Sequence, residues 1–577
     1  MDRNTLLRWL LIAGVMFGIY YFFFKGGSKK GQSIPEEHYI NAPGFVADKT
    51  IDPPTAPGVP NEPKEGDLCR IKGDKFTAEL SSRGAALKHL WITDAHYSDG
   101  PEGYDITTTP DHERWRSLRT LFRADGANDQ FAFDRFNWKL DSAAAADEKT
   151  CTFTYEDALV SVTKTIKATG KPYELDVQTT IKNLADAPKK HRFEIGTYAF
   201  RFNREVKGKW GRVSPFMTEL SCASTSEVTR KNKDDFKDGW LRKDSASRYA
   251  AVSNYYFGQA LMPTAGAAPN CEILAEQWYG ANQAPDDDDA AAIYHARLQY
   301  PVRELAPQTS VTYGLNAFFG PKERGALAVA GNGEPKLGDL INLGFFSPVA
   351  KVLVGLLTFL YGVTHNWGIA VILMTLCLRL ALFPLAIPQI KQSLLMRKLR
   401  PELDEIARKF KDDAQAKQMA TMELHRKNGV NLMMGCLPQL VQMPVWWAMY
   451  STLQTAVEMY HVKFLWFADL SAPDKFFILP ILLGGLGLVQ AKVMPQQPGQ
   501  DPQQQKMMMY MMPIIFTVMM LFLPAALGVY MTTNSLLGIT QQLLVERLAK
   551  RAESEAKKGE IEVKEVTPPK GKGKTRV

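Results

Sequence analysis

The sequence lacks the short motifs by which many enzymes and metal sites are recognised. None of its six cysteines lies in a Cys-x-x-Cys or other zinc-binding spacing. His112-Glu113 has no second histidine to complete a His-Glu-x-x-His site, and no Gly-x-Ser-x-Gly occurs. Gly573-Lys574-Thr575 resembles the end of a phosphate-binding loop, but Pro568 stands where its first glycine would be. These absences argue against an enzyme, a metal site and a bound cofactor.

Long apolar runs are scarce in the middle of the chain and concentrated in two other parts, the first 24 residues and about 340–545. The run Thr5–Phe24 is long enough to cross a bilayer. It ends in aromatic residues, whereas a cleaved signal peptide, the alternative, ends in small ones. We therefore predict an N-terminal transmembrane anchor at 1–24. Seven prolines between 33 and 63 then predict an extended tether over 25–65.

The region 66–325 is predicted to be a β-sandwich domain. Residues 173–181 alternate between apolar and polar side chains, and 191–199 alternate similarly. A period of two is typical of half-buried strands in antiparallel sheets. Cys69, Cys151, Cys222 and Cys271 lie here, so disulfides are possible in an oxidising compartment, although their pairing is open. The aspartates at 286–289 are interpreted as a solvated loop, with calcium binding as the alternative.

The second apolar part predicts a helical membrane core. In 345–363 the interruptions Lys351, Gly355, Thr358 and Gly362 form one helical stripe, which favours an amphipathic helix in the membrane interface over a full span. A span is predicted at 366–388 and four more within 432–546, at about 432–457, 476–494, 507–523 and 526–545. The fold class is therefore an all-β domain plus a core of five spans and an additional N-terminal anchor.

Charge sets the predicted orientation. The loop 389–431 holds ten Lys/Arg and six Asp/Glu, and the tail 547–577 holds ten and five. Four spans separate them, so both lie on one side, which the positive-inside rule makes cytoplasmic. The N- and C-termini are then cytoplasmic and the β domain lies outside. Apolar residues at helical spacing within 389–431 predict a helical hairpin. The basic patches suit anionic lipids or ribosomal RNA, and solvated, topology-setting charge is the alternative.

Several stretches in order along the chain resemble the YidC membrane protein insertases of Gram-negative bacteria. They are Asn366-Trp367-Gly368, Arg379 with Phe383-Pro384-Leu385, Gly435-Cys436-Leu437-Pro438, Gln442-Met443-Pro444, Asp469-Leu470-Ser471, Ile478 to Leu482, Gln504-Gln505-Lys506, Met512-Pro513 and Ile515-Phe516. The resemblance implies a periplasmic supersandwich related to sugar mutarotases. It also implies five core helices around a hydrophilic groove that is open to cytoplasm and lipid. It implies an inner-membrane insertase and chaperone that acts on nascent membrane proteins without nucleotide, alone or with the Sec translocon.

Arg379 is the sharpest candidate for the groove, because a charge within a span normally faces water or a partner. The alternative is an arginine that snorkels to the interface near Pro388. Other polar residues in the spans either line the groove or form ordinary interhelical hydrogen bonds. The groove residues that we predict are Arg379, Thr375, Gln439, Gln442, Asn534 and Gln541.

An apolar slide for the entering client helix is implied by the resemblance, with plain packing as the alternative. Its residues would be Met443, Pro444, Met519, Leu523, Tyr530 and Met531. Many relatives carry paired tyrosines where this chain has Tyr530-Met531, which removes one aromatic contact. The rival function is a small secondary transporter, but five spans without a visible repeat argue against it. A structural scaffold is a third possibility that Arg379 argues against.

Overall fold

The structure is a computed structural model that describes residues 65–98, 101–110, 115–123, 137–206, 218–236, 241–243, 246–264, 267–278, 287–288, 290–411, 413–429, 432–493 and 502–565. The predicted anchor 1–24 and all but the last residue of the tether 25–65 lie outside these ranges. The chain divides between Asn342 and Leu343 into two units, here called the β unit and the helical unit.

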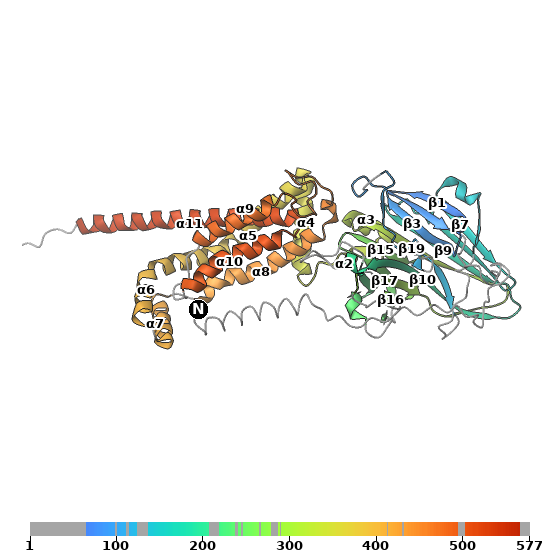
Figure 1. Ribbon diagram of the computed structural model, residues 1–577, viewed down its shortest axis with the longest axis horizontal. Helices are drawn as coiled ribbons and strands as arrows, with labels where there is room; N and C mark the ends of the chain where they lie inside the picture. The colour runs from blue at the N-terminus through green and yellow to red at the C-terminus, as the bar shows by residue number, and fades with distance from the viewer. Residues whose placement is uncertain are drawn as a thin grey trace, which may run out of the picture. The chain divides into compact units, whose positions relative to one another are not determined.

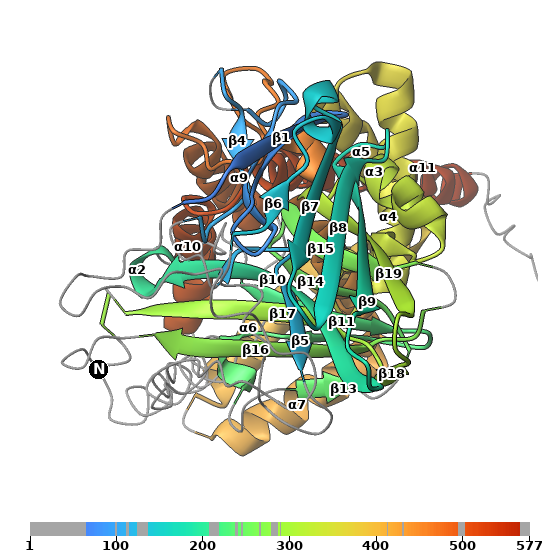
Figure 2. The same cartoon turned by 90° about the vertical axis from the view of Figure 1, so that its right-hand side faces the viewer.

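The β unit contains three antiparallel sheets (Figures 1 and 2). The small sheet has the order β1 (Leu68–Gly73), β2 (Phe76–Ser81), β3 (Ala86–Ile92), β4 (Tyr104–Asp105). The second has the order β13 (Leu241–Lys243), β16 (Asn270–Trp278), β17 (Ala291–Gln299), β10 (Lys189–Phe202), β18 (Arg303–Leu305), and β5 (Thr120–Arg123) also pairs with β10. The largest has the order β12 (Val228–Lys231), β11 (Glu219–Ser224), β14 (Ser247–Ser253), β15 (Phe257–Pro263), β19 (Ser310–Pro321), β9 (Glu174–Asn183), β8 (Val160–Ala168), β7 (Thr150–Glu156), β6 (Lys139–Leu140).

The two larger sheets face each other and form the predicted sandwich. Figure 2 shows β10, β16 and β17 crossing β7, β8 and β15 at a steep angle. Between the sheets, Phe193 of β10 stacks on Tyr313 of β19 with ring centroids 4.5 Å apart. His191 Nε2 lies 2.8 Å from the same tyrosine hydroxyl. Aromatic pairs of this kind fill the core between sheets whose inward side chains alternate with outward ones.

Strand β9 confirms the alternation seen in the sequence, with one exception. Leu175, Val177 and Ile181 are fully buried, while Gln178 is exposed. Glu174 is also fully buried, because its carboxylate accepts hydrogen bonds from the Gly331 backbone N–H at 2.7 Å and from Lys171 Nζ at 3.3 Å. A buried carboxylate needs such partners, and the Gly331 amide, 157 positions away, is not visible in the local pattern.

Two disulfides join distant strands of the β unit. Cys69 of β1 pairs with Cys151 of β7, and Cys222 of β11 pairs with Cys271 of β16. The second bond connects the two facing sheets. Of the aspartates at 286–289, Asp287 and Asp288 are described, and their backbone carbonyls accept hydrogen bonds from residues 203 and 204. The two disulfides give the pairing that the sequence left open.

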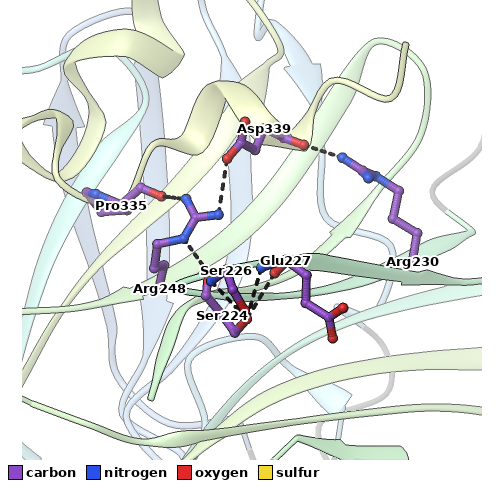
Figure 3. A network of polar contacts seen from close by, with 7 residues as sticks. All are labelled: Ser224, Ser226, Glu227, Arg230, Arg248, Pro335 and Asp339. Carbon is purple, nitrogen blue, oxygen red and sulfur yellow. Dashed lines mark hydrogen bonds and ion pairs between the residues drawn. The ribbon is translucent and has the colours of Figure 1, made fainter. Parts of the chain in front are cut away.

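The β unit extends beyond the predicted boundary at 325, through α3 (Arg324–Val329), η5 (Ala330–Gly333) and η6 (Leu337–Leu340). Figure 3 shows how Arg248 of β14 holds this segment. Its guanidinium donates to the carbonyls of Ser224 and Pro335, both at 2.6 Å, and to Asp339 Oδ2 at 3.1 Å. Arg230 donates to the Asp339 carbonyl. We call these contacts the 335–339 clamp.

The helical unit contains α4 (Ser347–Thr364), α5 (Trp367–Lys398), α6 (Arg400–Lys409), α7 (Ala414–Lys427), α8 (Leu432–Gln454), α9 (Ile478–Val493), α10 (Pro502–Met520) and α11 (Ala525–Glu565). Within the described residues, α4 and the first part of α5, Trp367–Pro384, are long and apolar enough to cross a membrane. The shorter run Ile478–Lys492 is also apolar. Figure 1 shows α5 and α8–α11 side by side, with α6 and α7 at one end of the bundle.

The largest differences from the predicted span ends are at the C-terminal ends of α5 and α11. Helix α5 continues past Pro388 to Lys398, so the hairpin begins at α6 rather than at 389. A proline within a membrane helix removes one backbone hydrogen bond, which neighbouring groups compensate more readily than in a soluble helix. Helix α11 continues to Glu565, because the first part of the tail is rich in the helix formers Ala, Glu and Lys.

Glycines bring α9 and α10 close together. A Cβ at Gly484 would lie 2.4 Å from Thr517 Oγ1, and one at Gly487 would lie 3.1 Å from Pro513 Cβ. Small residues three apart on one helix face are a common way for membrane helices to approach each other. Helix α10 has its main packing on α9, whereas α8 packs on α4 and α5. Helix α11 packs on α5 and α9.

Candidate functional site

Arg379 lies within the apolar part of α5 and is bound by α11. Its Nε donates to Asn534 Oδ1 at 2.7 Å, and one terminal nitrogen donates to the Asn534 backbone carbonyl at 2.8 Å. Both residues are partly buried. Two of the five N–H donors of the planar guanidinium are thus directed at one residue, which fixes the orientation of the whole group.

Gly538 makes room for this guanidinium. A Cβ built at Gly538 would lie 2.9 Å from a terminal nitrogen of Arg379. Gly538 follows Asn534 by one helical turn, so both face α5 on the same side of α11. Sequence reasoning missed this residue. The only available signal was a glycine one turn after a polar residue within a helix, and that pattern alone does not identify a partner.

Tyr530 and Gln442 lie beside the same arginine. Tyr530 precedes Asn534 by one turn on α11, and its side chain is 1% exposed. Its hydroxyl interacts electrostatically with Arg379 and lies close to the Gln442 side chain of α8, without a well-formed hydrogen bond. Three helices therefore contribute to one polar cluster: Arg379 from α5, Gln442 from α8, and Tyr530 and Asn534 from α11. We call it the Arg379 cluster.

No acidic side chain pairs with Arg379 within the part of the bundle that the structure describes. Its hydrogen-bond acceptors are both neutral oxygens of Asn534. A neutral acceptor orients a guanidinium but does not cancel its charge. The positive charge of the cluster is therefore available to a negatively charged group that approaches it.

The other predicted groove residues lie in different surroundings. Thr375 is buried, and its hydroxyl donates to the Val371 carbonyl of its own helix at 2.7 Å. Gln541 is half-buried on α11, two turns beyond Asn534. The side chain of Gln439 lies outside the described residues. The groove assignment of these three residues stays a prediction.

The predicted slide residues lie on α8, on α10, on α11 and, for Leu523, in the connection between α10 and α11, and their role as a slide stays a prediction. Met443 on α8 is 59% exposed, and Pro444 beside it is half-buried. Met519 of α10 and Met531 of α11 are half-buried, whereas Leu523 and Tyr530 are buried. Tyr530, assigned to the slide from the sequence, contacts the polar cluster. The exposed methionine is the part of this set that is free to meet an apolar ligand.

The basic hairpin has its own small core. Leu399 and Leu403 are buried at the start of α6, and Asp413 caps α7 by accepting from the backbone N–H groups of Gln415 and Ala416 at 3.0 and 2.9 Å. On α7, Met419 and Met422 are 64% and 57% exposed. The hairpin thus presents basic residues together with flexible apolar side chains.

Comparisons with known proteins cover both units. The family described as 60Kd inner membrane protein matches residues 359–553, and the family described as YidC periplasmic domain matches residues 68–356. A membrane protein insertase YidC from Anaeromyxobacter sp. (strain K) is 32% identical over 487 residues, which are 83% of this chain and 85% of that protein. Another from Geotalea uraniireducens (strain Rf4) is 31% identical over 481 residues, 83% of this chain and 86% of that protein.

One solved structure with the same name is also similar. It is described as an active YidC insertase with the first transmembrane domain resolved, and it covers 83% of this chain and 94% of its own, with 19% identity and a TM-score of 0.35. The family assignment rests on the sequence matches, which span the β unit and the helical unit together. The chain therefore belongs to the YidC family of membrane protein insertases.

Proposed function

We propose that the Arg379 cluster is the polar site through which this insertase moves the hydrophilic flank of a client protein. The observation that carries the proposal is an arginine inside an apolar helix, held in place by Asn534 and without an acidic partner among the described residues. Its bonds to α11 support an inward orientation over an arginine that snorkels to the interface. In a cavity with apolar walls, this charge attracts an acidic flank more strongly than it would in bulk water.

The apolar part of the client takes a separate path. We propose that it moves along the slide residues of α8 and α10, where Met443 is exposed and adaptable. Its transfer into lipid supplies the driving force, at about 25 cal/mol per Å² of apolar surface removed from water. The protein acts as an insertase and chaperone of nascent membrane proteins without catalytic chemistry, a cofactor or a nucleotide.

The topology that we propose has five core spans, an N-terminal anchor span, a periplasmic β unit and both termini in the cytoplasm. The two disulfides of the β unit support an oxidising compartment for that unit. The basic hairpin and tail support the cytoplasmic assignment. Helix α4 meets the length of a span, but its exposed stripe of Lys351, Gly355, Thr358 and Gly362 supports an interfacial position.

The basic charge of the hairpin and tail, and the family assignment, suggest further binding partners. We propose that the basic tail and hairpin contact anionic lipids and the ribosome, and that the protein works alone or beside the Sec translocon. Met419 and Met422 on the hairpin offer an initial apolar contact for an emerging client segment. These contacts precede the Arg379 cluster in the proposed order of events.

The experiment compares reconstituted insertion of two matched clients, one with an acidic and one with a neutral translocated flank. Arg379→Ala is expected to reduce insertion of the acidic client on the order of tenfold more than the neutral one, if about 1.4 kcal/mol of attraction is lost. Arg379→Lys keeps the charge and retains most activity, and Arg379→Glu is worst for the acidic client. The comparison is made at equal amounts of folded protein. Equal defects for both clients would refute the electrostatic role of Arg379.

A further inference from the structure

The segment between α8 and α9, residues 455–477, is an ordered structure rather than a simple connector. Leu470 N–H donates to the Val462 carbonyl at 3.0 Å, and Phe464 and Phe467 exchange backbone hydrogen bonds of 3.1 and 2.8 Å. Asp469 Oδ1 closes this small hairpin by accepting from the backbone N–H of His461 at 3.0 Å and of Ser471 at 2.8 Å. Together, these hydrogen bonds restrict the turn between Phe464 and Phe467 to one conformation.

The segment is also fastened to the bundle. The backbone N–H groups of Ala525 and Ala526, at the start of α11, donate to the carbonyls of Ala472 and Leu470 at 2.8 and 2.9 Å. The ring of Phe464 lies where a Cβ of Gly368 would be, 2.3 Å away, so the turn packs directly on the first residues of α5. Phe467 and Leu470 are buried. The turn therefore keeps a fixed position relative to α5 and α11.

Apolar side chains nevertheless point outward from this fixed turn. Leu465 at the tip is 72% exposed and has a φ of +51°, and Trp466 is 37% exposed. A leucine in the left-handed region is strained, and the surrounding hydrogen bonds hold it there. At the start of α9, Phe476 and Phe477 are 66% and 49% exposed, while Asp474 caps the helix through Leu479 N–H at 2.8 Å. An ordered scaffold thus presents four large apolar residues.

The position of this segment between membrane helices indicates what covers its exposed apolar side chains. The segment connects two helices assigned to the membrane and packs on the first residues of two others, at Gly368 of α5 and Ala525 of α11. It therefore lies at the level of the span ends, where the lipid headgroups are. Tryptophan is enriched at that level, and lysine side chains near it extend toward the headgroups. Lys463 and Lys475 are both exposed in this segment. We propose that Leu465, Trp466, Phe476 and Phe477 form a rigid anchor that inserts into the headgroup region of the outer leaflet.

This inference rests on the proposed membrane placement of the bundle, and it can fail independently of it. The full chain is prepared with Cys377 and Cys436 changed to serine, and one cysteine is introduced as Leu465→Cys, Ala468→Cys or Ile481→Cys. Each variant is labelled with an environment-sensitive fluorophore in vesicles of phosphatidylcholine and phosphatidylglycerol. Quenching by spin-labelled lipid is compared with quenching by aqueous iodide. Ala468 is the exposed control in the same segment, and Ile481 of α9, 68% exposed, is the lipid-facing reference.

The anchor predicts that lipid quenching at position 465 is severalfold stronger than at 468 and close to that at 481, with iodide quenching in the reverse order. Strong iodide quenching at 465 together with lipid quenching at 481 overturns the anchor proposal and leaves the membrane placement of the bundle intact. Protection of 465 from both quenchers shows that protein covers it, which also overturns the anchor. Absence of lipid quenching at 481 overturns the membrane placement itself. As a second measurement, Leu465→Asp is expected to reduce lipid quenching of a label at Phe476→Cys, because the two sites share one rigid segment.

Discussion

At the scale of single residues, the contact between Gly538 and Arg379 separates stability from function. Gly538→Ala is expected to displace the guanidinium, because the new Cβ would lie 2.9 Å from it, while removing a helix-interior glycine favours the helix by up to about 1 kcal/mol. We therefore expect an unchanged or higher melting temperature together with weaker insertion of acidic clients. Gly485→Ala is the matched control, since its Cβ would have no atom within 4 Å among the described residues. Equal client insertion by the two variants would contradict the positioning role.

A second residue-scale prediction concerns pH and the β unit. Lys164 is fully buried in β8 and donates to Thr120 Oγ1 at 2.9 Å and to the Leu118 carbonyl, and burial lowers its pKa to about 7. Between pH 7 and about 10 the unfolded chain holds a proton that the folded chain lacks, so stability should rise with pH, by at most about 1.4 kcal/mol per pH unit. Below pH 7 this contribution is constant. Burial also lowers the pKa of Lys322 to about 8, which adds a similar trend.

The Lys164→Met variant isolates the first contribution. Relative to wild type, the variant should gain stability as the pH falls from 9 to 7, because it has no amine to protonate in the core. Urea unfolding at several pH values, with the disulfides intact, measures the difference. Parallel curves for the two proteins would show that Lys164 does not titrate in this range.

Single residues also show which features could be predicted from the sequence alone and which could not. The alternation in β9 and the lone charge of Arg379 are local patterns, so both could be predicted. The partners of Arg379 come from residues more than 150 positions later, and no local pattern specifies that Gly538 would face it. The same is true of Glu174, whose burial depends on the Gly331 amide. Sequence patterns report which face a residue takes, but they do not report which distant group completes its hydrogen bonds.

At the scale of elements, the 335–339 clamp fixes the end of the β unit. Arg248→Met removes three hydrogen bonds and leaves the Pro335 and Ser224 carbonyls unpaired, which is expected to cost about 1–3 kcal/mol and to increase hydrogen exchange over 330–342. Lys243→Met is the control, because its ion pair with Glu227 at 2.8 Å lies at the surface and is expected to contribute little to stability. Equal exchange in both variants would show that the clamp does not hold the segment.

At this scale, helix ends were the least predictable feature. Pro388 was read as the end of a span, and the charge of 547–577 was read as a tail, yet α5 and α11 continue through both. Hydropathy describes which segments enter a membrane, and it contains no information on where a helix ends in water. That end is set by helix propensity and capping, and the start of the tail has high propensity. The start of α7 is marked by its own capping residue, Asp413.

At the scale of the whole molecule, the division between Asn342 and Leu343 indicates where a deletion of the β unit should end. Removing 66–300 would leave β18 and β19 without their partner strands, and β19 contributes several fully buried residues. Removing 66–342 ends at the boundary between the units. We expect the second deletion to leave more folded protein, measured by protease resistance of the bundle, with insertion of clients retained. Loss of insertion by a folded bundle would show that the β unit takes part directly.

The position of β19 has a consequence for how the molecule is made. This strand lies between β15 and β9 at the centre of the largest sheet, yet it is the last strand along the described part of the chain. Its pairing with β9 joins residues far apart in the sequence, such as Ala317 and Leu175, and contacts of this kind slow folding. The sheet cannot close in the order in which the chain is synthesised. Its two halves must wait, with β9 and β15 each exposing an unpaired edge, until residue 321 has reached the same compartment.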